Sequence, residues 1–168
     1  MTTSLSANIV AQLIATLTDP LTLSSPTDPL SYTKKISFAN GTGLNQADRM
    51  WHAQRTIGGS ATDSLDLAGG LLDGLGDAFT PARIKGVLVS AAAANPNILE
   101  LTRPAINGVP IFKAAGDALF VVPGGLVLWV APTAAGVVVT AATGDLIDLV
   151  NPAAGSCICD VAILGASA

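Results

Sequence analysis

Hydrophobic side chains near the start of the chain recur at a spacing that predicts an amphipathic helix. The segment 6–17, SANIVAQLIATL, places its apolar residues one turn apart along one stripe. Ser6 is a suitable N-cap, and Asp19-Pro20 ends the predicted helix. The residues of the stripe are Ile9, Val10, Leu13, Ile14 and Leu17.

A proline-rich stretch follows this predicted helix. Pro20, Pro26 and Pro29 argue against both a helix and a central strand in this region. We therefore expect residues 1–31 to form an N-terminal helix and an extended arm, separate from a β domain over residues 32–168. A helix this short is marginal in water, so its apolar stripe is expected to bind a partner. The candidate interface residues are Ile9, Leu13, Leu17, Leu21 and Leu23 from the arm and Trp51 from the β domain.

From Tyr32 onward, short apolar runs alternate with turn signals such as Asn40-Gly41 and Pro123-Gly124-Gly125. This spacing is typical of an all-β domain, a β-sandwich or jelly roll. The glycine-rich segment 69–80 is expected to be a loop with at most one helical turn. The predicted strands are 32–39, 49–57, 63–68, 82–92, 97–102, 109–114, 118–122, 126–131, 136–141, 145–150 and 156–164.

Two of these strands, LVLWVA and GVVVTA, are apolar at nearly every position. A strand of this kind is buried on both sides. We expect one side to face the core of the domain and the other to contact another subunit.

The composition of the chain predicts that its apolar surface is buried by self-association. Hydrophobic residues make up 50% of the chain and charged residues only 12%, with a mean hydropathy of +0.57. No apolar run approaches the 20 residues of a membrane-spanning helix, and no basic stretch suggests a secretory signal. The net charge of −4, with scattered basic residues, argues against nucleic-acid binding. A homo-oligomer without nucleic-acid or membrane partners is therefore predicted.

The candidate chemistry is sparse, and we predict no enzyme, no catalytic residue, no metal site and no cofactor. His52 is the only histidine, which excludes any two-histidine metal site. It is interpreted as a strand residue on a polar face or at an interface. Asp63, Asp66, Asp73 and Asp77 match no calcium-loop spacing, and Asx-turns are favoured over a cation site.

Two further features leave alternatives open. Trp51 lies in the polar-aromatic strand RMWHAQR, which suggests either cross-strand packing or a carbohydrate platform. Cys157 and Cys159 point the same way from one strand, a poor geometry for bridging each other. We interpret them as reduced, half-buried hydrophobes, with an intersubunit disulfide or a metal contact as the alternative.

Three stretches, taken in order, carry a resemblance to a known family. They are ISFANGTGLNQADRMWHAQRTIGGSATDSLDLAGGLLDGLGDAFTPARIKGVLVSAAAANPN, VVPGGLVLWVAPTAAGVVVTAATGDLIDLVNPAAG and CDVAILGAS, and they span about 130 residues from residue 36 onward. Together they resemble the minor capsid, head decoration or cement proteins of tailed siphophages. No single motif is specific, and none is catalytic.

The resemblance implies a β-sandwich or jelly-roll subunit, with a trimer favoured, on the outside of an icosahedral head. Its partners would be copies of itself and the phage major capsid protein. It would be made in the host cytoplasm and then incorporated into the virion. No functional residue is transferred by the resemblance. The alternative is a receptor- or glycan-binding module of a tail tip or fibre, with Trp51 or the 69–80 loop as its contact surface.

Overall fold

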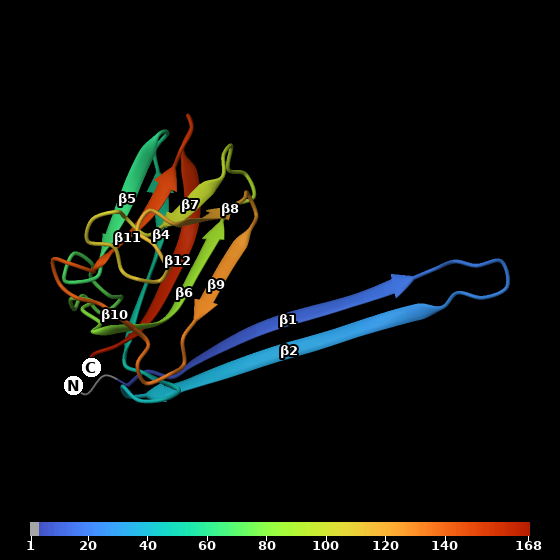
Figure 1. The fold of residues 1–168 in the computed structure, drawn as a ribbon, viewed down its shortest axis with the longest axis horizontal. Coiled ribbons are helices and arrows are strands. Elements are labelled where there is room, and N and C mark those ends of the chain that lie inside the picture. The colour runs from blue at the N-terminus through green and yellow to red at the C-terminus, as the bar shows by residue number, and fades with distance from the viewer. Residues whose placement is uncertain (1–3) are drawn as a thin grey trace.

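The computed structural model describes residues 4–168, which form a β-strand body and one long arm (Figure 1). Residues 4–168 contain strands, turns and loops but no helix. No helix in this part of the chain is therefore long and apolar enough to cross a membrane. The prediction of an all-β protein is confirmed.

The arm is a two-stranded antiparallel ribbon that leaves the body at one end (Figure 1). Strand β1 (Ala7–Thr18) pairs along its whole length with β2 (Thr27–Asn40), in a register that runs from Ala7 opposite Phe38 to Thr18 opposite Thr27. Residues 19–26 form the loop at its tip. At the base, β2 also pairs with the short parallel strand β3 (Gln46–Ala47). The arm therefore extends to residue 40, beyond the predicted boundary at residue 31.

The predicted N-terminal helix is wrong, because the same residues also alternate with the period of a strand. The odd positions from Ala7 to Leu17 are all Ala, Ile or Leu, whereas the even positions are mostly Asn, Gln and Thr. Residues 27–38 repeat this alternation, so the two segments can pair with their apolar side chains on one face. Pro29 is tolerated because β2 is an outer strand here, and Pro20 and Pro26 lie in the tip loop.

The body contains two antiparallel sheets. In the first, β4 (Arg49–Ile57) pairs with β12 (Cys157–Ala166), and β12 pairs with β6 (Arg83–Ala91). The other edge of β6 pairs with two strands, β9 (Leu126–Val130) and then β10 (Val137–Val138). The second has the order β5 (Ala61–Asp66), β11 (Leu146–Asn151), β7 (Leu99–Thr102) and β8 (Ala118–Val121).

The pairing of the body strands is nested around one central connection, residues 103–117. β7 pairs with β8, β6 with β9, β5 with β11, and β4 with β12, all antiparallel. The pairs β6–β12 and β7–β11 join this nested hairpin into the two sheets. Consecutive strands therefore cross repeatedly from one sheet to the other.

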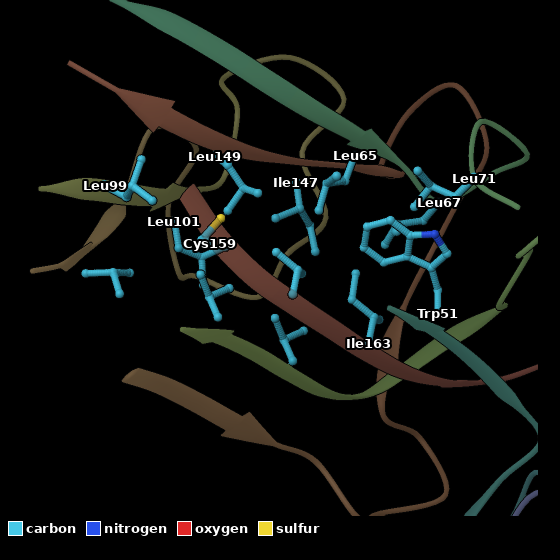
Figure 2. Close-up of a cluster of buried hydrophobic side chains, with 14 of the residues drawn as sticks. Trp51, Leu65, Leu67, Leu71, Leu99, Leu101, Ile147, Leu149, Cys159 and Ile163 are labelled. Atoms are coloured by element: carbon cyan, nitrogen blue, oxygen red, sulfur yellow. The ribbon is translucent and has the colours of Figure 1, made fainter. Parts of the chain in front are cut away.

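The hydrophobic core lies between the two sheets, as expected for a β-sandwich (Figure 2). Trp51, Cys159 and Ile163 enter from the first sheet and face Leu65, Leu99, Leu101, Ile147 and Leu149 from the second (Figure 2). Loop residues Leu67, Leu71 and Phe79 close one end of the core.

Most predicted strands of the body are present within a few residues of their expected limits. The predicted strand 109–114 is wrong, because that segment forms turns beside β11. The expectation of a loop over residues 69–80 is confirmed, since its only pairing is an isolated bridge between Leu72 and Ala78.

Candidate assembly surface

The two faces of the arm differ in chemistry. Cross-strand partners share a face, so the register assigns every side chain of the ribbon to one of two sides. On the polar face, Ser37 Oγ donates to Asn8 Oδ1 at 2.7 Å, and Gln12 Nε2 donates to Thr33 Oγ1 at 3.1 Å. The other side, here called the apolar face, holds Asp28 and Lys34 among Ala7, Ile9, Ala11, Leu13, Ala15, Leu17, Leu30, Tyr32, Ile36 and Phe38.

No part of residues 4–168 covers the distal part of the apolar face. Leu13 is 56% exposed and Leu17 73% exposed. Tyr32, opposite Leu13, and Leu30, opposite Ala15, are exposed as well. Leu21 and Leu23 in the tip loop are also exposed, Leu23 almost completely. The arm thus displays contiguous apolar surface of the kind that marks a protein interface.

The base of the same face already packs on the body. Phe38 is buried, and Ala7, Ile9 and Ile36 are half-buried, whereas Asn8 and Ser37 on the polar face remain exposed. A β-carbon added at Gly86 on β6 would lie 3.3 Å from Ile9 Cδ1, so the glycine leaves room for this side chain. The apolar face is therefore turned towards the outer side of the first sheet.

That outer side of the first sheet carries an apolar groove beside the arm. Register places Met50, Leu164, Gly86 and Val130 in one row across the sheet and Ala162, Leu88 and Leu128 in the next. A groove of about 390 Å³ lies over these residues and reaches residues 7–10 of β1. We call its body wall the outer patch, made of Met50, Gly86, Leu88, Leu126, Leu128, Ala162 and Leu164.

A polar rim borders the outer patch. His52 is exposed on β4 beside Ala162, and Gln54 Nε2 donates to Asp160 Oδ1 at 3.0 Å in the next row. An apolar centre with a polar rim is the usual anatomy of a protein–protein contact. Leu126 is 59% exposed, while Trp129 on the same strand packs against the core. The two-sided apolar strand predicted over residues 126–131 therefore has one side on the core and the other in the outer patch.

Lys85 lies where the root of the arm, residues 41–48, meets the body. Its side chain is fully buried, and Nζ donates to the carbonyls of Thr133 at 2.5 Å and Ala134 at 2.9 Å, with Gly43 at 3.4 Å. Burial lowers the pKa of Lys85, and the nearby charge of Arg83 acts in the same direction.

Asn45 N also donates to Pro132 O at 2.8 Å, and Asp48 N to Gly165 O at 3.1 Å. These bonds connect the segment after β2 to three separate parts of the body.

The two edges of the arm differ in composition. β1 contains neither proline nor a charged residue over its twelve positions, and hydrogen bonds to β2 use only one of its edges. β2 carries Pro29, Lys34 and Lys35, the residue types that discourage further strand pairing. The free edge of β1 therefore remains open to another strand.

The other candidate residues are placed away from any shared reactive centre. Trp51 is only 3% exposed and lies in the core, so its ring is not available as a carbohydrate platform on this subunit. Asp66 Oδ1 accepts from Ala68 N, and Asp73 Oδ1 accepts from Leu75 N and Asp77 N, as in Asx-turns. Residues 4–168 hold no group of three His, Cys, Asp or Glu side chains placed to bind a metal ion.

Both cysteines are free thiols within the core, more deeply buried than the half-buried positions expected. Burial raises the pKa of the Cys159 thiol to about 11, and the carboxylates of Asp63 and Asp160 act in the same direction. A buried thiol that stays protonated is a weak nucleophile. Asp63 is itself paired with Arg55, whose Nε and Nη2 donate to its two carboxylate oxygens at 2.6 and 2.7 Å.

The arm residues predicted from the sequence make up one part of this surface. Ile9, Leu13, Leu17, Leu21 and Leu23 all lie on the arm, and the first three share its apolar face. The contribution of β2 was missed, although residues 28–38 alternate as regularly as β1. The outer patch was foreseen only through the two-sided strand at 126–131. Comparison with known proteins gives no match to a family model, a curated protein or a solved structure.

Proposed function

We propose that this chain is a virion structural protein that decorates or cements the outside of a phage capsid. The observation that carries the proposal is the arm, which projects a long apolar face away from a self-contained body (Figure 1). A surface of this kind is useful to a protein that is permanently held by neighbours in a lattice. The sequence resemblance supplies the setting, a siphophage head, and the major capsid protein as partner.

The arrangement of the body supports a jelly roll as its finer fold. A jelly roll is a long hairpin of four strand pairs wrapped into two sheets. The pairs β4–β12, β5–β11, β6–β9 and β7–β8 are those that such a hairpin requires. Viral capsid domains and lectins are frequent users of this architecture. The fold by itself does not decide between them.

The placement of the aromatic residues favours assembly over glycan binding. Trp51 is in the core, and Trp129 packs against it, so neither indole is displayed as a flat sugar-stacking surface. Most of the large exposed apolar residues are instead aliphatic, with Tyr32 on the arm and Phe120 on β8 as the aromatic exceptions, and many of them lie along the arm and the outer patch. Aliphatic surfaces of this kind bury well against protein.

Addition of the purified protein to phage heads that lack it tests this function. We expect saturable binding of many copies to each head, and loss of binding when residues 12–33 are replaced by an Asn-Gly turn. This replacement joins Ala11 to its ladder partner Lys34 and leaves the base of the arm in place. The unshortened protein with Gln12→Asp is the matched control and should still bind. Recovery of only a few copies, located at the tail, would instead support the receptor-binding alternative.

A further inference from the structure

We propose that the occupant of the apolar face is the outer patch of a second copy of this chain. The arm of one subunit would lie across the β4–β12–β6–β9 sheet of its neighbour, and each subunit would both donate an arm and accept one. This inference deepens the proposed function, because it names the partner of the arm within the assembly.

The first support is continuity with a contact already made inside the chain. At its base, the apolar face of the arm packs on the outer side of the first sheet, with Ile9 against Gly86. Farther out, Leu13, Leu17 and Tyr32 continue the same face beyond the body. A second copy presents the same kind of sheet surface to these residues. The arm would therefore repeat between subunits the packing that it already uses within one.

The second support is that one contact covers both exposed surfaces. The outer patch contains Leu126, Leu128 and Met50, which face solvent or the groove. The chain's own distal arm is directed away from the body (Figure 1). Its root is bonded to the body through Asn45 N, which donates to Pro132 O, and through Gly43 O, which accepts from Lys85. An unrelated partner on the arm would leave the patch uncovered. A second copy covers the arm and the patch together.

The third support is the area that the exchange would bury. Beyond the base that packs on its own body, eight residue pairs from Ala11 to Thr18 at about 3.4 Å each give a ribbon about 27 Å long. A face about 10 Å wide therefore offers about 270 Å², and one arm contact alone would bury about 540 Å² in total, well below the roughly 1,600 Å² of a standard stable interface. A single arm contact is thus too small to be stable, which favours an arrangement in which each copy both donates and accepts an arm and so buries about 540 Å² per subunit. Leu21 and Leu23 in the exposed tip loop add to this area.

The contact is head-to-tail, because an arm meets a body rather than another arm. Such contacts close into rings when the rotation between subunits allows it. A ring leaves no unpaired arm and no uncovered patch.

The first test measures the mass of the purified protein by light scattering over a range of concentrations. The wild type is expected to form a discrete oligomer. The double variant Leu13→Asp/Leu17→Asp should raise the dissociation constant at least about 100-fold, since it places charges in the buried centre of the contact. The control Gln12→Asp/Thr16→Asp carries the same charges at the same spacing on the polar face and should leave the oligomer intact. Unchanged far-UV circular dichroism and thermal stability would show that both variants are folded.

The second test identifies what the arm touches. Chains carrying Leu17→Cys are mixed with chains carrying Leu126→Cys and treated with a short bismaleimide. The native thiols are buried and should not compete. A cross-linked heterodimer in the mixture supports the exchange. Cross-linking of Leu17→Cys chains to each other would instead show arm-to-arm pairing and overturn the proposal.

The remaining outcomes separate this proposal from the proposed function. A wild-type monomer at high concentration, with binding to heads lost on Leu13→Asp/Leu17→Asp, would overturn self-exchange while leaving capsid decoration intact. An arm-dependent oligomer that does not bind heads would support self-exchange and contradict capsid decoration. A monomer that co-sediments with phospholipid vesicles through its arm would overturn the exchange in favour of a membrane partner.

Discussion

Strands of the arm and of the body show a similar alternation of apolar and polar side chains. The two regions nevertheless bury their apolar side chains to very different extents. In β12, every second residue from Cys157 to Ile163 is buried in the core. In β1, the corresponding alternation from Ile9 to Leu17 becomes steadily more exposed with distance from the body. The difference lies in the second layer: β12 has a facing sheet within the chain, and β1 has none. An amphipathic strand in this molecule thus marks a surface that requires a partner, whether or not the chain supplies one.

The same substitution made in both regions should give the largest contrast. Leu149→Ala removes a fully buried side chain between the sheets and should lower the free energy of unfolding by about 2–5 kcal/mol. Leu17→Ala on the exposed arm should change it by less than about 0.5 kcal/mol for the isolated subunit. Urea denaturation at low protein concentration measures both. A large loss from Leu17→Ala in a monomer would mean that the arm is part of the folded core.

A substitution at the junction of the two regions should have an intermediate effect. Lys85→Met keeps most of the aliphatic side chain but removes the ammonium that binds the carbonyls of Thr133 and Ala134. We expect a loss of about 1–3 kcal/mol, because buried acceptors are left without a donor. Amide hydrogen exchange should accelerate over residues 41–46 and 132–136 and stay slow in β11. Unchanged exchange in those segments would show that Lys85 does not hold the root of the arm.

The smallest expected effect appears only at alkaline pH and belongs to the body. Because the folded pKa of Cys159 is about 11 and its ordinary value is near 9, the unfolded chain loses this proton first. The contribution of Cys159 to the free energy of unfolding is therefore full below pH 9. It is lost as the pH rises from about 9 to 11, by up to about 2 kcal/mol.

A comparison of Cys159→Ala with the wild type isolates this titration. The variant starts less stable at pH 7, and the gap should narrow as the pH rises. A gap that stays constant from pH 7 to 11 would contradict the raised pKa. At neutral pH, a cysteine introduced at Leu17 on the arm should react readily with maleimide, whereas Cys159 should not.

Local signals were sufficient for most of the body and insufficient for the arm. Turn residues such as Pro123-Gly124-Gly125 and Asn151-Pro152 mark the ends of strands, so β9, β11 and β12 could be predicted closely. Ile9, Leu13 and Leu17 are four residues apart. This spacing places them on one face of a helix, about one turn apart, and equally on one face of a strand, where every second side chain points the same way. What decides between the two is the matching alternation in β2, and this information lies in a different part of the sequence.

The outer patch could not be assembled from sequence because its residues come from four strands. Met50, Leu88, Leu128 and Leu164 become neighbours only through the register of the sheet. The strand over 126–131 indicated that a second apolar surface exists, but not which residues share it. The burial of Trp51 was likewise undetermined, since its strand also carries Arg49, His52 and Arg55.

The attachment of the arm has a consequence for the order in which the molecule matures. β1 and β2 precede every strand of the body in the chain, so they leave the ribosome first. Their root is bonded to groups that come much later in the chain: Lys85 on β6, the carbonyl of Pro132, and the carbonyl of Gly165 in the last strand. A nascent or truncated chain therefore has the apolar face of the arm without the hydrogen bonds that fix the root of the arm to the body. The arm therefore acquires its fixed direction relative to the body only when β12 completes the body.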